Sequence, residues 1–304
     1  MIDFSPSPVQ NIDIEGFSLF LKRDDLLDPD FSGNKARKFY YFLKNDFPDI
    51  NIVVSFGSNQ SNAMYSLSVL CKLKGWEFEY FIDHIDKNLL QNAKGNLKLA
   101  LKNSMNLKLK KEWDYNFGFN NLTSETKIIR DTLFIPEGGR CETSYFGIEI
   151  LAKEIIEFKK LKGIKKLHIF LPSGTGVTAL FLQKALKLSN DTSQAYTVAC
   201  VGGKEYLKKE FFSLEDNPYF HPLILGDKKY HFGKLREEFY LLWKRLKEQS
   251  GVEFDLLYDP IGIKTMVKYL EKNPVKSVMY IHQGGTIGNI SMIDRYKRKY
   301  GEDR

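Results

Sequence analysis

The sequence has few of the residues that build disulfides or metal sites. It contains three cysteines, Cys71, Cys141 and Cys200, which are far apart and odd in number, and it has no Cys-x-x-Cys pair. This pattern argues against a disulfide framework, and we expect reduced thiols and a cytoplasmic location. The five histidines are scattered, without a pair at the spacing of zinc ligands, so we expect no metal site.

Long apolar runs and signal-like segments are also lacking. No uninterrupted apolar stretch approaches the ~20 residues that cross a bilayer, and residues 1–6 show no basic n-region and no apolar h-region. We therefore expect no membrane partner and no secretory signal. With 43% hydrophobic residues among 304, the chain can bury one large core or two medium ones.

The net charge of +7 raises the question of nucleic-acid binding. Lysines and acids are interspersed along most of the chain, and the densest basic run, 295–299, lies close to the end of the sequence. Nucleic-acid-binding proteins usually concentrate their charge on one element. We therefore expect a lysine-rich surface and no nucleic-acid partner.

Short apolar segments alternate with longer amphipathic segments along the chain. The predicted strands are 50–56, 77–82, 107–110, 167–172, 196–201 and 278–282. The predicted helices are 62–74, 89–103, 144–158, 179–188, 234–250 and 263–272. This alternation indicates an α/β protein with open, mostly parallel twisted sheets and helices on both faces. Two sheets are required, and we expect a small domain, 47–144, inserted into a large domain formed by 1–46 and 145–304.

Lys35 follows a Gly-Asn turn, at a place where a helix would begin. Its tether is then short and its direction is defined. The positive end of a helix and the neighbouring cations Arg37 and Lys38 would both favour the neutral amine, which attacks a carbonyl to form a Schiff base. For a single lysine, a solvated basic turn is the better interpretation, so the remaining motifs decide.

The segment 173–178, Ser-Gly-Thr-Gly-Val-Thr, leaves a predicted strand and opens a predicted helix. Two glycines allow close approach of backbone N–H groups, and a helix start suits a phosphate. The string Gly-x-Gly-x-x-Ala also resembles a dinucleotide motif, but that motif requires an acid after the next strand, whereas Asp191 precedes it. A mononucleotide-sized phosphate fits better, and a tight turn without any ligand stays an alternative.

A second polar turn, 57–62, reads Gly-Ser-Asn-Gln-Ser-Asn between a predicted strand and a predicted helix. Helix capping requires only one such side chain, so five in a row favour a site that grips a carboxylate. Gly-Gly turns follow strands at 137–140 and 282–286, and each alone would be an ordinary turn.

In this order, the five segments resemble the D-cysteine desulfhydrase and 1-aminocyclopropane-1-carboxylate deaminase family. The matching motifs are Gly-Asn-Lys-x-Arg-Lys, Gln-Ser-Asn, Pro-x-Gly-Gly, Ser-Gly-Thr-Gly-x-Thr and His-x-Gly-Gly, spread over about 21–288. The resemblance implies a pyridoxal 5'-phosphate (PLP) enzyme of fold type II, which is tryptophan-synthase-β-like, with PLP in the interdomain cleft. It also implies a homodimer.

The resemblance implies roles for individual residues. Lys35 would hold the cofactor as a Schiff base and shuttle the substrate proton, Lys38 would help to neutralise the phosphate, and Asn62 would bind the phenolic oxygen. The phosphate cradle would consist of Ser173, Gly174, Thr175, Gly176, Val177 and Thr178. Ser61 would act at the reacting carbon or bind the substrate carboxylate. The predicted substrate-binding residues are Gln60, Ser61, Asn62, Gly138 and Gln283.

Two segments depart from the family pattern on the side that chooses the substrate. The family has Asp-Pro-Val-Tyr, then Thr or Glu, then Gly-Lys; its tyrosine lies over the cofactor and the next residue faces the pyridine nitrogen. Here 259–264 is one residue shorter and lacks that tyrosine, although Tyr258 lies just upstream. Gln283 stands where thiol-type members have threonine and cyclopropane-type members have leucine, and 140–141 is Arg-Cys instead of Ser-Asn.

The resemblance therefore predicts a PLP-dependent lyase or deaminase that acts on a small amino acid. The leading reaction is β-elimination from D-cysteine to pyruvate, ammonia and sulfide. Ring opening of 1-aminocyclopropane-1-carboxylate is the second. The missing tyrosine leaves a third interpretation, a PLP-holding protein with little catalysis, and a dinucleotide-binding oxidoreductase is a fourth.

Overall fold

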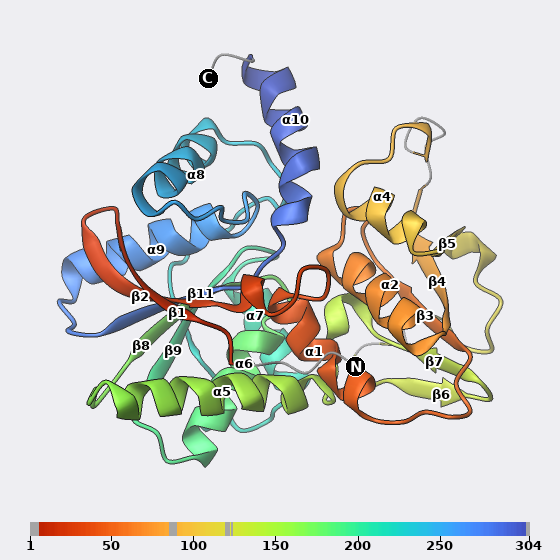
Figure 1. Cartoon of the computed structure of the whole chain (residues 1–304), viewed down its shortest axis with the longest axis horizontal. Coiled ribbons are helices and arrows are strands. Elements are labelled where there is room, and N and C mark those ends of the chain that lie inside the picture. Colours follow the sequence, from red (N-terminus) through yellow and green to blue (C-terminus); the bar gives the residue numbers. More distant parts are fainter. Residues whose placement is uncertain (1–5, 85–89, 119–121, 123, 302–304) are drawn as a thin grey trace.

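The computed structural model describes residues 6–84, 90–118, 122 and 124–301, and these residues form two sheets (Figure 1). The larger sheet has the strand order β1-β2-β11-β8-β9-β10, and its pairs are parallel except for the β1–β2 hairpin. Its strands are β1 (Val9–Ile14), β2 (Phe17–Arg23), β8 (His168–Ser173), β9 (Gln194–Ala199), β10 (Leu223–Ile224) and β11 (Val278–His282).

The smaller sheet has the strand order β5-β4-β3-β7-β6, and only β6 and β7 pair antiparallel. Its strands are β3 (Ile52–Phe56), β4 (Glu77–Ile82), β5 (Asn106–Leu109), β6 (Lys127–Ile129) and β7 (Thr132–Phe134). The predicted α/β class with two open, mostly parallel sheets is therefore confirmed. All five strands fall within the predicted insertion, while the domain boundaries at 46/47 and 144/145 stay a prediction.

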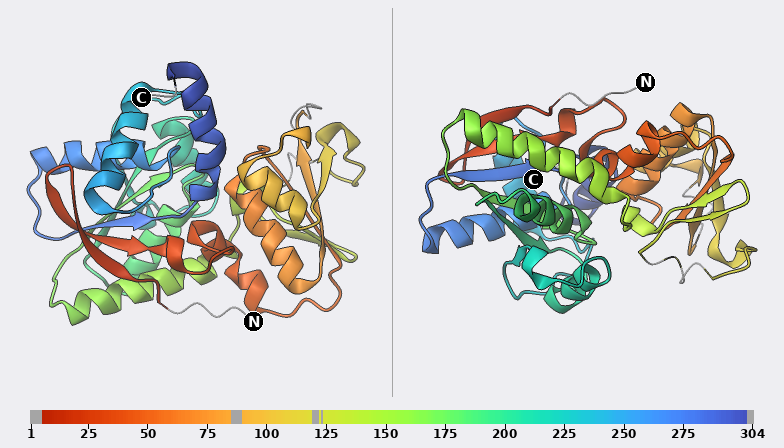
Figure 2. Two further views of the ribbon diagram at one scale, coloured as in Figure 1. Left: turned by 45° about the horizontal axis from the view of Figure 1, so that its top comes forward. Right: turned by 90° about the horizontal axis from the view of Figure 1, so that it is seen from below.

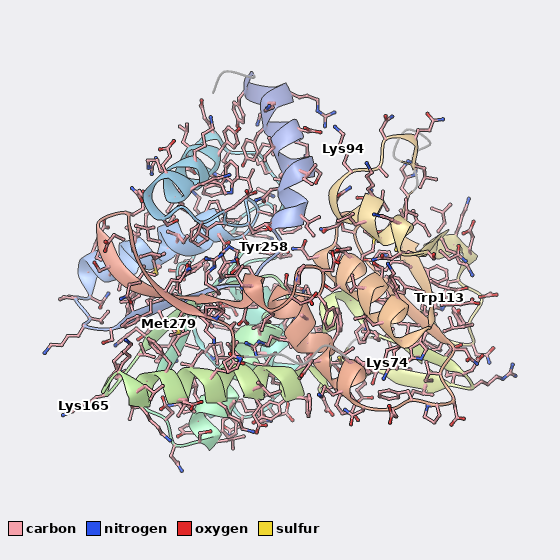
Figure 3. All side chains as sticks on the ribbon, viewed as in Figure 1. Lys74, Lys94, Trp113, Lys165, Tyr258 and Met279 are labelled. Carbon is pink, nitrogen blue, oxygen red and sulfur yellow. The ribbon has the colours of Figure 1, made fainter. Side chains whose placement is uncertain are left out.

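Helices cover both faces of the larger sheet because side chains alternate along its central strands. On β11, Tyr280 packs against one helix layer, while Met279 (Figure 3) and Ile281 pack against the other. The first layer contains α8 (Glu237–Ser250), α9 (Asp259–Lys272) and α10 (Asn289–Tyr300); the second contains α5 (Ser144–Leu161) and α6 (Val177–Leu188). Figure 2 shows α5 (green) on the opposite side of the sheet from α8 and α9 (blue).

Three further helices complete the site-bearing part of the fold. The smaller sheet packs against α2 (Asn62–Lys74) and, beyond it, α4 (Gly95–Lys102); α1 (Gly33–Lys44) joins the same apolar core and also packs on α5. A shorter helix, α7 (Lys204–Phe212), follows β9. In the ribbon, α1 therefore runs between the two sheets (Figure 1).

The predicted elements 62–74, 77–82 and 278–282 coincide with α2, β4 and β11. The predicted helix 89–103 is wrong as a single element, because 92–94 break it and α4 begins only at Gly95; residue 89 lies outside the described residues. The sequence analysis missed α7, α10 and the β1–β2 hairpin. The many basic residues of α10 made its apolar positions hard to recognise in the sequence. These positions are Met292 and Tyr296, which are four residues apart and buried against the core.

Within the described ranges, no helix is long and apolar enough to cross a membrane. Over the same residues, no cluster of three or more His, Cys, Asp or Glu side chains is arranged to hold a metal ion. Cys71, Cys141 and Cys200 are all buried and free.

Candidate active site

A cavity of about 1440 Å³ lies between the loops that follow strands of both sheets. Its wall comes from the segments after β2, β8 and β11 of the larger sheet and after β3 and β7 of the smaller one. The first residues of α1, α2 and α6 all reach this wall. Open α/β sheets bind ligands at this edge, where strands end and helices begin.

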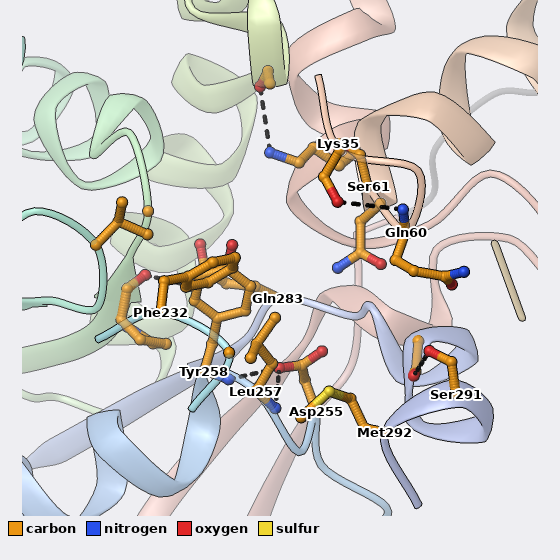
Figure 4. A pocket seen from close by; sticks show the side chains of 18 of the residues that line it. Lys35, Gln60, Ser61, Phe232, Asp255, Leu257, Tyr258, Gln283, Ser291 and Met292 are labelled. Carbon is orange, nitrogen blue, oxygen red and sulfur yellow. Dashed lines mark hydrogen bonds between the residues drawn. The ribbon is translucent and has the colours of Figure 1, made fainter. Parts of the chain in front are cut away.

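Lys35 lies in the first turn of α1 and extends its side chain into the cavity (Figure 4). Its Nζ donates a hydrogen bond to the carbonyl oxygen of Gly138 at 3.2 Å. Burial lowers the pKa of this amine to about 8, although the neighbouring Lys38 side chain and the charge of Glu137 act in the opposite direction. An appreciable neutral fraction of the amine therefore exists close to neutral pH.

Lys38, one turn further along α1, connects this lysine with the loop before α6. Its Nζ donates to the Gly138 carbonyl oxygen at 3.1 Å and to Thr175 Oγ1 at 3.5 Å. Burial and the charge of Lys35 hold the pKa of Lys38 well below its usual value. A Cβ on Gly138 would lie 3.8 Å from Lys35 Nζ and 3.5 Å from Thr175 Cγ2, so both side chains flank this glycine.

The loop 174–178 forms the start of α6 and has the donors that a phosphate requires. Gly176 is the N-cap residue with φ +79°, and a Cβ there would lie 2.5 Å from the side chains of Leu207 and Phe211, so only glycine fits. The first N–H groups of a helix have no partner within the helix. Together with Lys38 and the hydroxyls of Thr175 and Thr178, they suit a doubly charged anion.

Ser173, at the end of β8, has another bonding partner. Its buried Oγ forms a hydrogen bond of 2.6 Å with Thr197 Oγ1 on β9, so the hydroxyl links two strands of the sheet. Ser173 still lines the cavity, as do Gly174 and Val177.

Gln283 lines the cavity, but its side-chain amide is already engaged. Its Oε1 accepts a hydrogen bond from Asn34 Nδ2 at 3.0 Å, and its Nε2 donates to the Pro172 carbonyl oxygen at 2.8 Å. Its backbone oxygen accepts from Asn34 N at 2.9 Å and would lie 2.1 Å from a Cβ on Gly33. Gln283 therefore holds the loop before Lys35 against the end of β8, a contact for which the sequence gives no local signal.

The polar turn before α2 forms the opposite wall. Ser61 is the N-cap residue, its Oγ accepts from Ala63 N at 3.1 Å, and its side chain lines the cavity. The Oδ1 atom of Asn62 accepts from Asn96 Nδ2 at 2.7 Å, so that the Asn62 amide nitrogen is oriented. Gln60 also lines the cavity, with a buried Oε1 that has no hydrogen-bond partner among the described residues.

The segment before α9 contributes two groups that the sequence analysis left open or missed. Tyr258, labelled near the middle of Figure 3, lines the cavity, and its hydroxyl would be 3.3 Å from a Cβ on Gly174. Asp255, which the sequence analysis did not single out, lines the same wall (Figure 4). Both positions depend on the chain path between α8 and α9, which no local pattern indicates.

Arg37 does not lie beside the Lys35 amine, contrary to our expectation. Its guanidinium is fully buried on the other side of α1, where it pairs with Asp24 at 2.8 Å and with Glu154 at 2.6 Å. Lys22 joins the same network through Glu154 at 2.6 Å. The network therefore anchors α1 to β2 and α5. Of Arg37 and Lys38, the two cations that we expected beside Lys35, only Lys38 lies there.

The chain was compared with known proteins. No family model matches it. A protein of Pyrococcus horikoshii described as a putative 1-aminocyclopropane-1-carboxylate deaminase is 22% identical over 316 residues, which cover 95% of this chain and 92% of the relative. The crystal structure of a homologue of 1-aminocyclopropane-1-carboxylate deaminase superposes with a TM-score of 0.77 at 19% identity and covers 97% of this chain and 94% of that one. The chain has the tryptophan-synthase-β-like fold.

The predicted resemblance and fold class are thus confirmed, and the fold is type II of the PLP enzymes. A hydrogen-sulfide-producing enzyme of Fusobacterium nucleatum has the same architecture, with a TM-score of 0.61 at 12% identity over 91% of this chain and 93% of that one. At these identities the solved structures establish the fold alone.

Proposed function

We propose that this protein is a PLP-dependent lyase or deaminase acting on a small amino acid. The observation that carries the proposal is the placement of the Lys35 amine and the start of α6 on adjoining walls of one cavity, with Lys38 between them. A phosphorylated aldehyde needs these two features, a nucleophilic amine and an anion cradle, within the length of one molecule. The descriptions of the matched relatives agree with this enzyme class.

The residues present fit the cofactor. Lys35 would bind its aldehyde carbon, while Lys38, Thr175, Thr178 and the N–H groups of 174–178 would hold its phosphate. The glycine at 176 allows α7 to pack closely against this loop, because any side chain there would collide with α7. Asn62, oriented by Asn96, presents an amide nitrogen to the same space.

The chain's own groups then act on the amino acid. When bound, PLP accepts the electron pair released at the substrate α-carbon. The neutral Lys35 amine, favoured by the lowered pKa, would take the α-proton at Nζ and pass a proton to the leaving group. The Ser61 hydroxyl and the N-terminal N–H groups of α2 would bind the substrate carboxylate and orient the bond to be broken.

D-cysteine is our leading substrate because its reaction needs a single base. One D-cysteine and one water give pyruvate, ammonia and hydrogen sulfide; the C–S and C–N bonds break and no external oxidant is required. Lys35 is a lysine of lowered pKa positioned in the cavity for that base role. The hydrogen-sulfide-producing enzyme among the solved neighbours is consistent with this proposal.

Ring opening of 1-aminocyclopropane-1-carboxylate is the second candidate, and the descriptions of the two relatives reported above favour it. That substrate lacks an α-proton, so its reaction would have to start with a step other than removal of an α-proton by Lys35. The Tyr258 hydroxyl inside the cavity is available for such a step. A PLP-holding protein with little turnover is the third candidate, and a homodimer in the cytoplasm stays a prediction.

The experiment is a substrate panel with the PLP-loaded protein. D- and L-cysteine, D- and L-serine and 1-aminocyclopropane-1-carboxylate are incubated with the enzyme, and keto acid, ammonia and sulfide are measured. We expect keto-acid release with at least one of them, loss of release in Lys35→Ala, and retention in Lys44→Ala at the far end of α1. Bound PLP without release from any substrate would instead support the binding protein.

A further inference from the structure

Asp255 is a buried acid whose free oxygen faces the cavity. Its side chain lies just before α9, is 4% exposed and belongs to the cavity wall (Figure 4). Neither the family motifs nor the proposed reaction assigns it a role. A carboxylate in such a position is costly unless a donor or a cation pairs with it.

One of the two carboxylate oxygens is satisfied by the loop itself. Oδ1 accepts hydrogen bonds from Leu257 N at 2.9 Å and from Tyr258 N at 2.6 Å, which fixes the orientation of the carboxylate. Oδ2 accepts no hydrogen bond from any of the described residues. This second oxygen would lie 3.0 Å from a Cβ on Gly285, and Asn62 Nδ2 would lie 2.5 Å from the same point.

Gly285 therefore lies close against both the Asp255 carboxylate and the predicted cofactor-binding amide of Asn62. Its φ of +87° is a conformation that other residues rarely adopt, and a Cβ there would collide with both groups. Both residues line the cavity side by side, where Asp255 supplies the negative charge and Asn62 the amide donor.

The charges around Asp255 leave it in need of a positive partner. Asp259, the other buried acid of this segment, accepts hydrogen bonds from Tyr280 Oη at 2.7 Å and from Asp255 N at 2.8 Å. The two cavity lysines of α1, Lys35 and Lys38, donate hydrogen bonds to Gly138. Burial raises the pKa of Asp255 to about 7, as expected for a carboxylate that lacks a cation.

We propose that Asp255 is the positioning residue that binds the ring nitrogen of PLP through Oδ2 and keeps that nitrogen protonated. The inference rests on the proposed function. It names a partner for the pyridine nitrogen, which the family has in the segment corresponding to 259–264 and which this chain lacks there. In the family, the tyrosine comes first and the partner of the pyridine nitrogen follows it, within the segment corresponding to 259–264. In this chain the acid, Asp255, comes first and the aromatic residue, Tyr258, follows it, and both precede α9. A protonated ring nitrogen strengthens the electron withdrawal that the reaction requires.

The test uses PLP labelled with ¹⁵N in the ring, bound to the whole protein without substrate. We expect the ¹⁵N chemical shift of a protonated pyridine in the wild type and of an unprotonated one in Asp255→Asn. Asp191→Asn is the control, because Asp191 is a carboxylate with a largely buried side chain, paired with Lys159, that does not line the cavity. It should keep the wild-type shift.

The outcomes separate this inference from the proposed function. If the wild type binds no PLP, the proposed function fails as well. If the wild type binds PLP with an unprotonated ring nitrogen, or if Asp255→Asn leaves the shift unchanged, only the role of Asp255 is wrong. An unchanged shift with weakened binding of an amino acid would assign the carboxylate to the substrate instead, which also overturns the proposal. If the variant does not fold, the wild-type shift at neutral pH decides.

Discussion

Lys35 and Lys38 donate hydrogen bonds to the same atom, the carbonyl oxygen of Gly138, at 3.2 and 3.1 Å. Two ammonium groups this close repel each other, and burial opposes both charges. The charge of Lys35 contributes to the lowered pKa of Lys38. Binding of an anion at Lys38 and of a carbonyl group at Lys35 would therefore relieve this repulsion.

Loading with PLP should depend on pH in a defined window. The Lys35 amine has a pKa of about 8 in the folded protein, below the usual 10.5, and only its neutral form attacks the aldehyde. Below about pH 8 the amine is mostly protonated, so the loading rate should fall about tenfold for each further pH unit. Stopped-flow absorbance of the apoprotein mixed with PLP measures this rate. A rate that keeps rising only toward pH 10.5 would contradict the placement of the amine.

Replacing Lys38 should weaken cofactor binding more than it affects the fold. Lys38→Met removes the ammonium beside Thr175 Oγ1, and a hydrogen bond to a charged group contributes about 1.5–3 kcal/mol, so PLP affinity should fall roughly ten- to a hundredfold. Equilibrium titration with PLP measures the change. Pyridoxal without phosphate is the control ligand, and its affinity should not fall with that of PLP; equal losses for both would contradict the phosphate role.

The turn before Lys35 should tolerate only glycine at position 33. Gly33 has φ +67°, and a Cβ would lie 2.1 Å from the Gln283 carbonyl oxygen, so Gly33→Ala must move the loop that carries Lys35. We expect a loss of about 3 kcal/mol or more in the free energy of unfolding, measured by denaturant titration.

Gly16→Ala is the matched control for this substitution. Gly16 also has a positive φ, +83°, but nothing lies within 4 Å of its Cβ position. It should therefore lose only the backbone term of about 1–2 kcal/mol. Equal losses in the two variants would show that the close approach of Gly33 to Gln283 does not matter.

The buried network behind α1 should contribute much more stability than an exposed ion pair. Arg37→Met leaves Asp24 and Glu154 without their guanidinium, which should cost about 3–5 kcal/mol in unfolding free energy. Arg245→Met, which breaks a pair with Glu15 at an arginine that is 50% exposed, should cost about 0–1 kcal/mol. Similar costs for both variants would refute the anchoring role of Arg37.

The same network should make stability sensitive to acid. Burial alone would raise the pKa of Asp24, but the charges of Arg37 and Lys22 outweigh it and lower the pKa below its usual value. The ionised form is thus the stabilising one, so its contribution is complete above the unfolded-state pKa and disappears as the pH falls through the folded-state pKa. Thermal melts in the acidic range should show a smaller difference between wild type and Arg37→Met.

Local sequence patterns predicted the two loops that, in our proposal, bind the aldehyde and the phosphate of PLP. Lys35 follows a turn and 174–178 follows a strand, so each depends on a few neighbouring residues, and the structure brings both to one cavity. The use of the Gln283 amide could not be predicted, because its partners Asn34 and Pro172 are more than a hundred residues away.

Asp255 and the direction of Tyr258 were also beyond a local reading. Both depend on the irregular segment between α8 and α9, where hydrogen bonds from backbone N–H groups to Asp255 set the path. The β1–β2 hairpin, in contrast, did have a signal. The turn at 15–16 is Glu-Gly, both residues have positive φ, and buried side chains alternate along the second half of β1.

The central claim is that one amine, that of Lys35, binds the aldehyde carbon of PLP. Borohydride reduction of the PLP-loaded protein, followed by peptide mass mapping, tests it directly. The account predicts a phosphopyridoxyl group on the peptide that carries Lys35 and none on that peptide in Lys35→Ala. Modification of another lysine in the wild type, or no modification at all after saturation with PLP, would contradict it.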